Sequence, residues 1–436
     1  MKILSTLALF FAFTLLQAQQ IWSLEDCINH ALKNNISLKQ SKLNIQLNES
    51  QYLQSKMQLL PSISASSSFN KNQGRYINPL TNDFVEEVSS SLNLSYSTNM
   101  TLFNGFKNIN QIKKAANESL KSIYDLESAK NDLISSIALS YLQILFNKEL
   151  YETATKQLNL TKNQKNRIIT LVEAGSIARG ELLNIQSQLA LEEQQLIQAE
   201  NKLNLSKLQL AQLLELENHQ KLEVLKLNIQ IPDFEIKNNI NSDFSTALNN
   251  QSTIKSAELQ INSALYDLKI AKANYSPNLS LGHRTSTLHA NTEDMFSFYE
   301  QLENNKQSGI YLNLNIPIFN KWTAHSAVDQ SKIQIENSRL SAQQAKNQLR
   351  KNMEQAYADK LAAYKKYQAA QKSVVAYKES FTYVNERYEL GMLNSYEFNE
   401  SKNKLIKSES DELQAKYDLI FKVKLYEFYT SQTFEL

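Results

Sequence analysis

The sequence predicts a mainly α-helical chain that carries a small membrane β-barrel and is built from two similar halves. Two stretches, Ser91 to Gly105 and Gly309 to Phe319, alternate apolar and polar residues as β-strands do. Two other runs, Phe106 to about Leu171 and Trp322 to about Tyr388, contain neither glycine nor proline. Each run predicts a helix of roughly 100 Å at 1.5 Å per residue, a length that no single globular domain needs.

The first alternating stretch has the length of a membrane-spanning strand. Its apolar positions are Leu92, Leu94, Tyr96, Met100 and Leu102, and serine, asparagine or threonine stand between most of them. Strands of soluble proteins average roughly 5–6 residues, whereas a strand that crosses a bilayer needs about 9–11. The alternation continues for about a dozen residues, which favours a membrane barrel with one apolar and one polar face.

The same landmarks return at one fixed offset, which indicates a duplicated unit. Phe103-Asn104 at the end of the first stretch reappears as Phe319-Asn320, 216 positions later, and this offset also relates Gly175 to Gly391 without a gap. Landmarks of several kinds that keep one register predict two structurally equivalent halves, which we place at residues 19–231 and 232–436.

Composition argues against nucleic acid as a partner. Forty-six Lys and Arg stand against 44 Asp and Glu, so the chain lacks the basic excess that binding to a phosphate backbone requires. With seven glycines and five prolines, most of the chain can be helical. The single cysteine, Cys27, cannot form an intramolecular disulfide.

Residues 1–18 are predicted to be a signal peptide. Lys2 supplies the charged start, Ile3 to Leu16 supply the apolar run, and Leu16-Gln17-Ala18 is a suitable cleavage site. At about 14 residues the apolar run is too short for a spanning helix, which needs about 20. A mature chain that enters a membrane therefore does so by strands.

The first half is predicted to run helix, two strands, long helix and return helix. Gln20 to Leu60 form a helix that Pro61 ends, and strands follow at about 62–70 and 91–103 with an exposed loop between them. After the long helix, Gly175 turns the chain, and the return helix begins at Glu181. Residues of about 217–242 form a connector between the halves.

The second half repeats this order. A helix from Ser242 to Tyr275 ends before Pro277, and strands are expected at about 278–286 and 309–319 around a second exposed loop. Gly391 makes the second turn, and the return helix runs from Tyr396 to Tyr429. The long helices carry imperfect seven-residue apolar series, which predicts coiled-coil packing.

Four strands cannot close a barrel, since about eight are needed even for a filled interior. Lipid does not tolerate open strand edges, so the chain must assemble. Three copies would give a trimeric α-helical tube joined to a shared 12-stranded β-barrel, with the polar strand faces lining a lumen.

These features together resemble TolC-like outer-membrane efflux proteins over essentially the whole mature sequence. The resemblance is carried by the duplicated strand and helix order, by the strand exits LFNGF (Leu102 to Phe106) and IFNKW (Ile318 to Trp322), and by the second turn. There, Arg387 to Gly391 is similar to the RYxxG pattern at the periplasmic tips of that family, whereas the first turn keeps only Gly175.

The resemblance implies a homotrimer in the outer membrane of a Gram-negative cell, with its helical tube in the periplasm. It implies a passive exit duct of a tripartite efflux or type I secretion system, opened when a membrane-fusion adaptor docks and an inner-membrane pump engages. The adaptor-docking turns would contain Gly175, Gly391, Arg387 and Leu390, and the barrel strand exits would contain Phe103, Asn104, Phe319 and Asn320.

The resemblance also implies an acidic ring at the entrance, six and nine residues after the turn glycine. Glu397 and Glu400 occupy these positions in the second half, whereas the first half has Glu181 and then Asn184. Such a ring would favour cations. The alternative is that these glutamates are ordinary solvated charges of a helix.

Catalysis finds no support in the sequence, so we expect no enzyme, no cofactor and no metal site. The five histidines are scattered without ligand spacing, and no phosphate loop, nucleophile elbow or dinucleotide fingerprint is present. Two other classes remain open. One is a secreted structural coiled-coil protein without a channel, and the other is a periplasmic enzyme on a helical scaffold.

Overall fold

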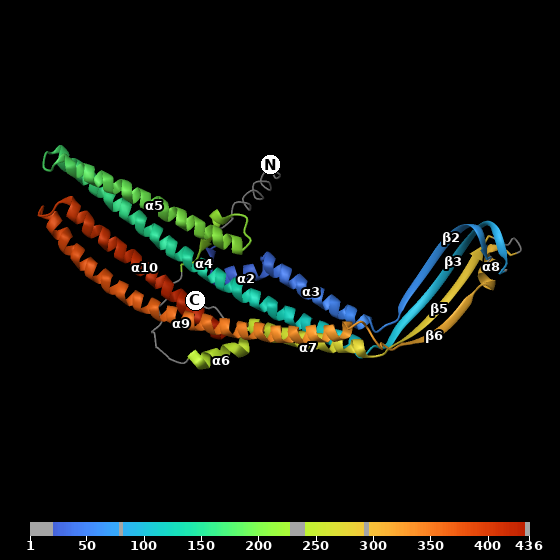
Figure 1. The fold of residues 1–436 in the computed structure, drawn as a ribbon. Helices are drawn as coiled ribbons and strands as arrows, with labels where there is room; N and C mark the ends of the chain where they lie inside the picture. The colour runs from blue at the N-terminus through green and yellow to red at the C-terminus, as the bar shows by residue number, and fades with distance from the viewer. Residues whose placement is uncertain (1–20, 78–81, 227–239, 292–295, 432–436) are drawn as a thin grey trace, which may run out of the picture. The chain divides into compact units, whose positions relative to one another are not determined.

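The computed structural model describes residues 21–77, 82–226, 240–291 and 296–431 (Figure 1). The predicted signal peptide and half of the predicted connector, residues 227–239, lie outside these residues. The chain forms two compact units, and each takes residues from both halves of the sequence. The first unit contains Met1–Lys42, Tyr124–Ile254 and Ala345–Leu436, and the second contains Leu43–Ile123 and Lys255–Gln344.

The second unit contains a four-stranded antiparallel sheet in the order β2-β3-β5-β6. The strands are β2 (Ser62–Ile77), β3 (Phe84–Phe103), β5 (Asn278–Ala290) and β6 (Gln307–Asn315). Each half of the sequence contributes two neighbouring strands, and β2 and β6 form the edges. The period of two in the sequence therefore corresponds to real strands, and the pairing brings the two halves together at β3 and β5.

The two faces of this sheet differ sharply in polarity. Ser64 pairs with Ser97 and Ser66 with Ser95, and the hydroxyls of each pair are hydrogen-bonded at 2.8 and 2.7 Å. On the same face, the hydroxyl of Tyr311 donates to Asn99 Oδ1 at 2.8 Å. The opposite face carries large exposed apolar side chains, among them Ile63, Phe69, Leu281, Ile310, Leu312 and Leu314. One face thus suits water and the other suits lipid.

The first hairpin is longer than the sequence indicated. The stretch 70–90 is predicted to be a loop, yet Lys71 to Ile77 pair with Ser90 to Phe84 beyond the end of β5. Gly74 has a φ of +127° within this ribbon. A two-stranded ribbon exposes both of its faces, so it accepts polar residues that a half-buried strand would not. Because most residues of this ribbon are polar, apolar and polar residues do not alternate there, and the sequence does not indicate strands.

The stretch between β5 and β6 also differs from the expected loop, because it contains the short helix α8 (Phe298–Asn304). β6 reaches only as far as Ser286 of β5, and α8 covers the rest of that edge. Asn305 Nδ2 donates to the carbonyl of Leu288 at 2.8 Å, and Gln301 Oε1 accepts from the amide of Ala290 at 3.0 Å. Side-chain amides therefore replace the missing strand.

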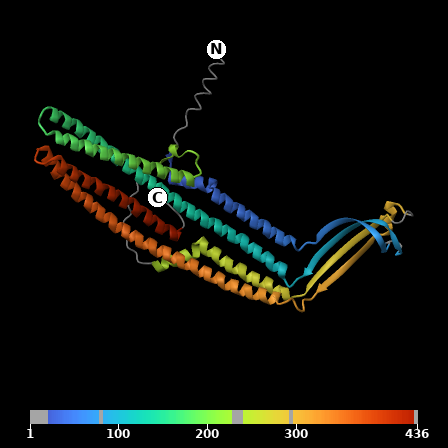
Figure 2. The same ribbon diagram turned by 45° about the horizontal axis from the view of Figure 1, so that its top comes forward.

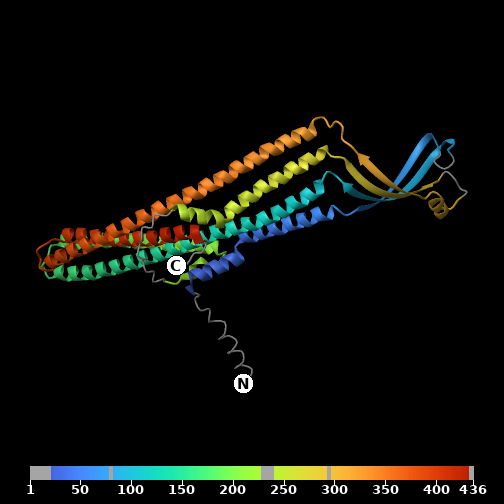
Figure 3. The ribbon, with the colours of Figure 1, turned by 90° about the horizontal axis from the view of Figure 1, so that it is seen from below.

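Four helical segments of the second unit run side by side, in the order α3, α4, α7 and α9 (Figure 3). The helices are α3 (Ile36–Met57), α4 (Lys107–Glu173), α7 (Ser252–Lys272) and α9 (Thr323–Glu389). Lys114 of α4 forms an ion pair of 2.8 Å with Asp267 of α7, and Asn117 bonds Ser263 at 2.9 Å. Polar contacts thus join the two halves of the sequence here.

The first unit is built around an apolar core. It gathers residues from β1 (Ile21–Trp22), α2 (Leu24–Asn34), α4, α5 (Arg179–Leu213) and β4 (Glu223–Val224), with Tyr417 and Ile420 from α10 (Ser395–Ser431). Tyr141 is fully buried in it, and its hydroxyl donates to the carbonyls of Trp22 and Leu225. This core fixes the start of the described chain against α4.

The helix expected from Gln20 to Leu60 is interrupted at Asn35, between α2 and α3. Asn35 has an extended ψ of 130°, and its side chain accepts from the amide of Leu38 at 3.2 Å. Asparagine can compete with the helix in this way by bonding the backbone itself. The helix expected from Ser242 to Tyr275 is interrupted at Gln251, between α6 (Ile240–Asn250) and α7. No glycine or proline marks either break.

Two helical hairpins extend from this core, α4 with α5 and α9 with α10 (Figure 2). Contacts between them are supplied mainly by α10, which bonds α4 and α5 from the other half of the sequence. Among the residues described, no helix combines the length and the apolar character that crossing a membrane requires.

Candidate entrance at the helical tips

Both hairpins turn by the same backbone motif. The amide of Ser176 donates to the carbonyl of Leu171 and the amide of Gly175 to that of Val172, at 2.9 and 3.0 Å. Met392, Arg387, Gly391 and Tyr388 repeat these bonds in the second turn with the same lengths. Gly175 and Gly391 have φ values of +71° and +72°, which only glycine adopts without strain. Glycine is thus required in both turns by the backbone.

Glu181 and Ser395 join the starts of the two return helices. The hydroxyl of Ser395, which is buried, donates to Glu181 Oε2. Ser395 is the first residue of α10, and Asn394 before it accepts from the amide of Glu397 at 2.9 Å. Asparagine at this position caps the helix. Glu181, which the sequence places in the acidic ring, is therefore held in a contact between the two hairpins.

The ends of α4 and α9 are joined by Arg167 and Glu389. Arg167 Nη1 lies 3.1 and 2.9 Å from the two carboxylate oxygens of Glu389. Both side chains are exposed to about half or more of their area, so water screens the pair. A contact of this kind stabilises one arrangement of the tips weakly and can be broken reversibly.

The contacts of Tyr388 show why an aromatic residue follows Arg387 in the second turn. Its ring stacks on that of Phe398 with centroids 4.5 Å apart, and Phe398 is buried in the first turn of α10. Burial raises the pKa of the Tyr388 hydroxyl, and the nearby negative charge of Glu181 raises this pKa further. The tyrosine therefore stays neutral and packs the turn from inside.

A cavity of about 430 Å³ opens between the two tips. Its walls include the apolar side chains of Ile168, Leu171 and Leu393, together with Arg167 and Glu181. Leu390, Met392 and Tyr396 lie around the second turn, and each exposes about two thirds of its side chain or more. Exposed apolar side chains that gather in one place often mark an interaction site in proteins.

Glu397 and Glu400 are exposed on α10, one turn apart, as expected. Glu400 Oε1 accepts from Lys404 Nζ at 2.7 Å, and this carboxylate raises the pKa of Lys404. The charge of Glu400 is thus compensated locally by a lysine, whereas the amide of Glu397 is capped by Asn394 and its side chain is free to project. Of the three predicted ring glutamates, Glu181 lies in a contact between the hairpins, and Glu397 and Glu400 are exposed on α10.

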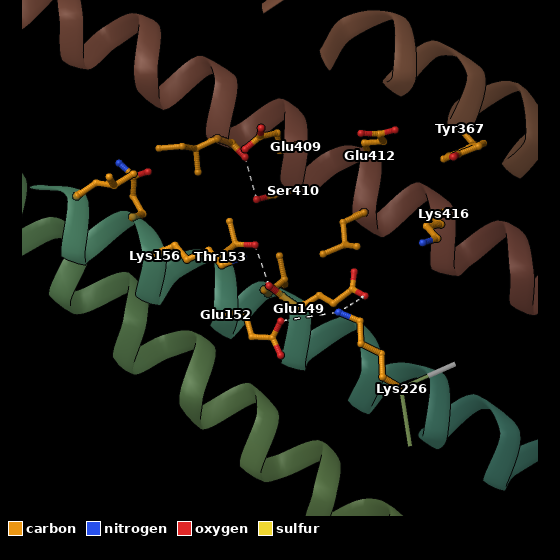
Figure 4. A pocket seen from close by; sticks show the side chains of 15 residues that line it. Glu149, Glu152, Thr153, Lys156, Lys226, Tyr367, Glu409, Ser410, Glu412 and Lys416 are labelled. Atoms are coloured by element: carbon orange, nitrogen blue, oxygen red, sulfur yellow. Dashed lines mark hydrogen bonds and ion pairs between the residues drawn. The ribbon is translucent and has the colours of Figure 1, made fainter. Parts of the chain in front are cut away.

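A larger cavity, of about 620 Å³, lies farther from the turns, between α4 and α10 with Tyr367 of α9 (Figure 4). Its labelled side chains carry both signs of charge, and Lys226 pairs with Glu149 at 3.3 Å and with Glu152 at 3.8 Å. Burial and the neighbouring Glu412 raise the pKa of Glu409. The helices therefore separate here and meet again on either side.

Comparison with known proteins assigns the family. The model of the family described as "Outer membrane efflux protein" matches residues 27–215 and 244–422, more than half of the chain. The chain belongs to the outer membrane efflux protein family. The two matched segments correspond to the two halves, and members of this TolC-like family are channels of the outer membrane and not enzymes. The expected family and location are confirmed.

Individual relatives are distant in sequence and similar in fold. The chain is 23% identical to the toxin and drug export protein A of Aggregatibacter actinomycetemcomitans over 351 residues, 76% of this chain and 70% of that protein. Among solved structures, the CmeC outer membrane channel of Campylobacter jejuni matches with a TM-score of 0.81 and 18% identity, covering 93% of this chain and 85% of that one.

A membrane protein of Pseudomonas aeruginosa matches with a TM-score of 0.79 at 16% identity, over 95% of this chain and 90% of the other. At this identity the likeness concerns the fold. It confirms the predicted class, a mainly helical chain with a small four-stranded sheet.

The backbone conformation that follows the strands is the same in both halves of this efflux protein. Gly105 and Phe106 have positive φ values of 64° and 62°, and so do Lys321 and Trp322, at 54° and 67°. Phe103 ends β3, whereas its counterpart Phe319 lies after β6 and is 80% exposed. An asparagine follows each phenylalanine and accepts hydrogen bonds from the start of the next helix. Asn104 Oδ1 accepts from the amide of Asn108. The carbonyl of Asn320 accepts from the hydroxyl of Thr323, and Asn320 Oδ1 accepts from the amide of Ala324. The expected strand 309–319 is thus four residues too long at its end.

Arg167, Glu389, Ser395 and Phe398 belong to the tips of this efflux protein but were not among the site residues predicted from the sequence. The interaction between Arg167 and Glu389 joins residues 222 positions apart. The position equivalent to Arg167 in the second half holds Tyr383, so the repeat gives no hint of the pair. Phe398 could have been found from its place three residues after Ser395, on the inner face of the first turn of α10. Among the described residues, no group of His, Cys, Asp and Glu gathers to hold a metal ion.

Proposed function

We propose that three copies of this outer membrane efflux protein form a passive exit duct whose helical tips dock a periplasmic adaptor, and through it an inner-membrane pump. The observation that carries the trimer is the pair of edge strands. β2 and β6 are the outer strands of the sheet, and among the described residues each pairs with only one other strand. Two open edges on opposite sides of one sheet suit pairing between copies.

Three four-stranded sheets make a closed barrel of twelve, a number that leaves an aqueous channel in lipid. The polar face with Ser64, Ser97 and Asn99 then lines the lumen, and the face with Ile310 and Leu312 meets the bilayer. A structural coiled-coil protein outside the membrane would have no use for a second, apolar face of this kind.

Docking at the tips is supported by their exposed apolar residues. Leu390 and Met392 are 73% and 65% exposed beside the turn that contains Gly391 and Arg387. An adaptor that covers them would also change the contacts of Arg167 and Glu181 close by. We propose Glu397, with Glu400 and Glu181, as the acidic ring at the entrance. The related export protein is named for toxins and drugs, and these are the cargo classes to try first.

The decisive measurement is the protein mass of the particle extracted from outer membranes in mild detergent, by light scattering corrected for bound detergent. Three chains per particle support the duct. A monodisperse monomer that stays soluble without detergent contradicts it and favours the structural coiled-coil protein.

Docking is tested separately with charged substitutions at the tip. Leu390→Asp with Met392→Asp should abolish export from cells while leaving the particle mass unchanged. Val375→Asp, at a comparably exposed position on α9, is the matched control and should export normally. Normal export by the tip variant would remove these residues from the docking surface.

A further inference from the structure

Arg284 of β5 carries the only charge of its kind in the paired strands. Residues 62–70, 91–103, 278–290 and 307–315 contain no other lysine or arginine and no aspartate or glutamate. Along β3, the next charged residue is Glu87, which lies in the ribbon beyond the end of β5. Neutral polar residues suffice to make the rest of this sheet compatible with water, so the polarity of the sheet does not require a charge here.

The register of the sheet places Arg284 on the polar face. Arg284 pairs with Ser97 of β3 and with Gly309 of β6. Ser97 pairs in turn with Ser64, and the hydroxyls of these two serines are hydrogen-bonded at 2.8 Å. Residues directly opposite each other in antiparallel strands point to the same face. The exposed Arg284 side chain therefore stands on the face that lines the lumen in the proposed duct.

The neighbours of Arg284 on this face leave its guanidinium group uncovered. Gly309 has no side chain, and a Cβ there would meet nothing within 4 Å. Gly282 lies under the ring of Tyr311, because a Cβ on Gly282 would clash with that ring. The Tyr311 hydroxyl donates to Asn99 Oδ1 at 2.8 Å, which ties the ring down across the sheet. The guanidinium group thus has open space beside it and no carboxylate in the paired strands to neutralise it.

The proposed trimer brings three copies of Arg284 to one height of the lumen, because its chains are equivalent. Twelve strands spaced about 4.8 Å apart and tilted by roughly 40° enclose about 24 Å between opposite backbones. Arginine side chains that extend roughly 6 Å inward come within about 10 Å of one another, which is one Debye length at about 0.1 M salt. The potentials of the three charges therefore overlap in the lumen.

A guanidinium group suits one class of ligand. It presents donors in a planar fork that matches the oxygens of a carboxylate or a phosphate, and it stays charged at any physiological pH. One exposed arginine holds such an anion weakly, because water screens the attraction. Three arginines around one lumen can act on the same anion, so multivalent anions gain most. Rings of arginine or lysine are used in this way by pores for anions and phosphate.

We propose that Arg284 and its two copies form an anion site in the barrel lumen, which takes the carboxylate or phosphate groups of passing cargo. This inference rests on the proposed duct and deepens it, because it names a chemical class of cargo and the residue that recognises it. Arg284 belongs to the second unit, whereas the proposed acidic ring belongs to the first. The two charged rings therefore favour opposite ions in different parts of the duct.

Calorimetric titration of the full-length trimer in detergent with sodium tripolyphosphate tests the site. The wild type should bind one tripolyphosphate per three chains at low salt, and Arg284→Gln should abolish this binding. Arg284→Lys keeps the charge without the fork, so its affinity should be about tenfold lower than that of the wild type. The matched control is Lys71→Gln, which removes an exposed basic side chain from the opposite face of β2 and should bind as the wild type does.

Ion selectivity provides the second readout. Reversal potentials in a salt gradient across planar bilayers should shift towards cation preference in Arg284→Gln, because the positive charge of the lumen is lost. Arg284→Lys and Lys71→Gln should both keep the wild-type reversal potential. A lysine that retains the selectivity and loses the affinity separates the effect of the charge from that of the planar fork.

The outcomes separate this inference from the proposed function. A particle that is not a trimer contradicts the duct, whatever it binds. A trimer that binds no tripolyphosphate overturns the anion site and leaves the duct standing, and so does unchanged binding in Arg284→Gln or an equal loss in Lys71→Gln. If Arg284→Gln does not assemble, Arg284→Lys decides, because wild-type affinity in that variant contradicts recognition by the guanidinium fork.

Discussion

Asn35 and Gln251 make the same hydrogen bond in the two halves of the chain. Asn35 Nδ2 donates to the carbonyl of Leu213 at the end of α5, and Gln251 Nε2 donates to that of Tyr429 near the end of α10. Both residues lie where a short helix breaks, and each bond spans 178 positions. The repeat thus preserves a contact although the side chain that makes it has changed.

This relationship predicts unequal costs for two alanine substitutions. Asn35 also accepts from the amide of Leu38 and caps α3, so Asn35→Ala should cost about 2 kcal/mol. Gln251→Ala removes one bond and should cost about 1 kcal/mol. Thermal unfolding followed by circular dichroism should show the larger fall in Tm for Asn35→Ala. Equal falls would mean that the cap does not contribute.

The contact of Gly105 with Ser276 predicts a substitution that a second one rescues. A Cβ on Gly105 would lie 2.5 Å from Ser276 Cβ and 3.1 Å from the carbonyl oxygen of Ala273. Lys321 occupies the equivalent position at a φ of 54°, so the backbone conformation alone does not demand glycine. Gly105→Ala should therefore lower Tm more than Gly175→Ala, whose Cβ would meet nothing within 4 Å.

Adding Ser276→Gly to Gly105→Ala should recover part of the loss, since it removes the clashing Cβ. If Tm does not recover, the loss in Gly105→Ala comes from backbone strain and not from the contact of the new Cβ with Ser276. Gly175→Ala itself should cost about 1–2 kcal/mol, the strain of a left-handed residue.

The entrance glutamates should differ in their effect on ion selectivity. Lys404 compensates the charge of Glu400, whereas Glu397 forms no ion pair with another described residue of α10, so Glu397→Ala should weaken cation preference more than Glu400→Ala does. The double variant should also raise conductance. Reversal potentials in a salt gradient measure this, with Glu336→Ala, an exposed acid paired with Arg339, as the control. Unchanged selectivity in all variants would assign both glutamates to the solvated helix surface.

Arg167 and Glu389 should show a small coupling. A double-mutant cycle with Arg167→Met and Glu389→Gln, read as the ratio of open to closed channel, should give about 0.5–1 kcal/mol at low salt and less at high salt. Arg167→Lys should keep part of the coupling, because both contacts to Glu389 come from one nitrogen, Nη1, which an ammonium group can imitate. Additive single effects would show that the pair does not hold the tips.

Cys27 should be inert in the folded protein. Burial raises the pKa of its thiol to about 12, so almost no thiolate is present at pH 8. Maleimide labelling should be slow until the chain unfolds. Because the thiol ionises earlier in the unfolded chain, it lowers stability as pH rises from about 9 towards 12. Cys27→Ala should remove this part of the alkaline loss, and rapid labelling at pH 8 would contradict the burial.

Features with a short period could be predicted from the sequence, and contacts between the halves could not. Leu92 to Leu102 reveal a strand because alternation is local, and Gly175 and Gly391 reveal turns because each follows a long run without glycine. Lys402 and Glu192 form a buried ion pair but are 210 positions apart, and the residue equivalent to Lys402 in the first half is Gln186. No pattern within either half could pair them.

Two breaks in secondary structure were missed for a physical reason. Asn35 and Gln251 interrupt helices through side-chain bonds to distant carbonyls, which tertiary packing supplies and local propensity does not. Around Gly74 the sequence predicts a loop where the structure has two paired strands. The residues there are polar and compatible with a loop, and only the pairing of the two segments makes them strands.

The free edges of β2 and β6 have a genetic consequence. In the proposed trimer each sheet needs a neighbouring copy on both sides, so one faulty edge would prevent the shared barrel from closing. In a cell that expresses two alleles, a variant that folds but carries a proline in the outward edge of β6 should act dominantly and disable most mixed assemblies. A variant that fails to fold at all should be recessive, since it never enters the ring.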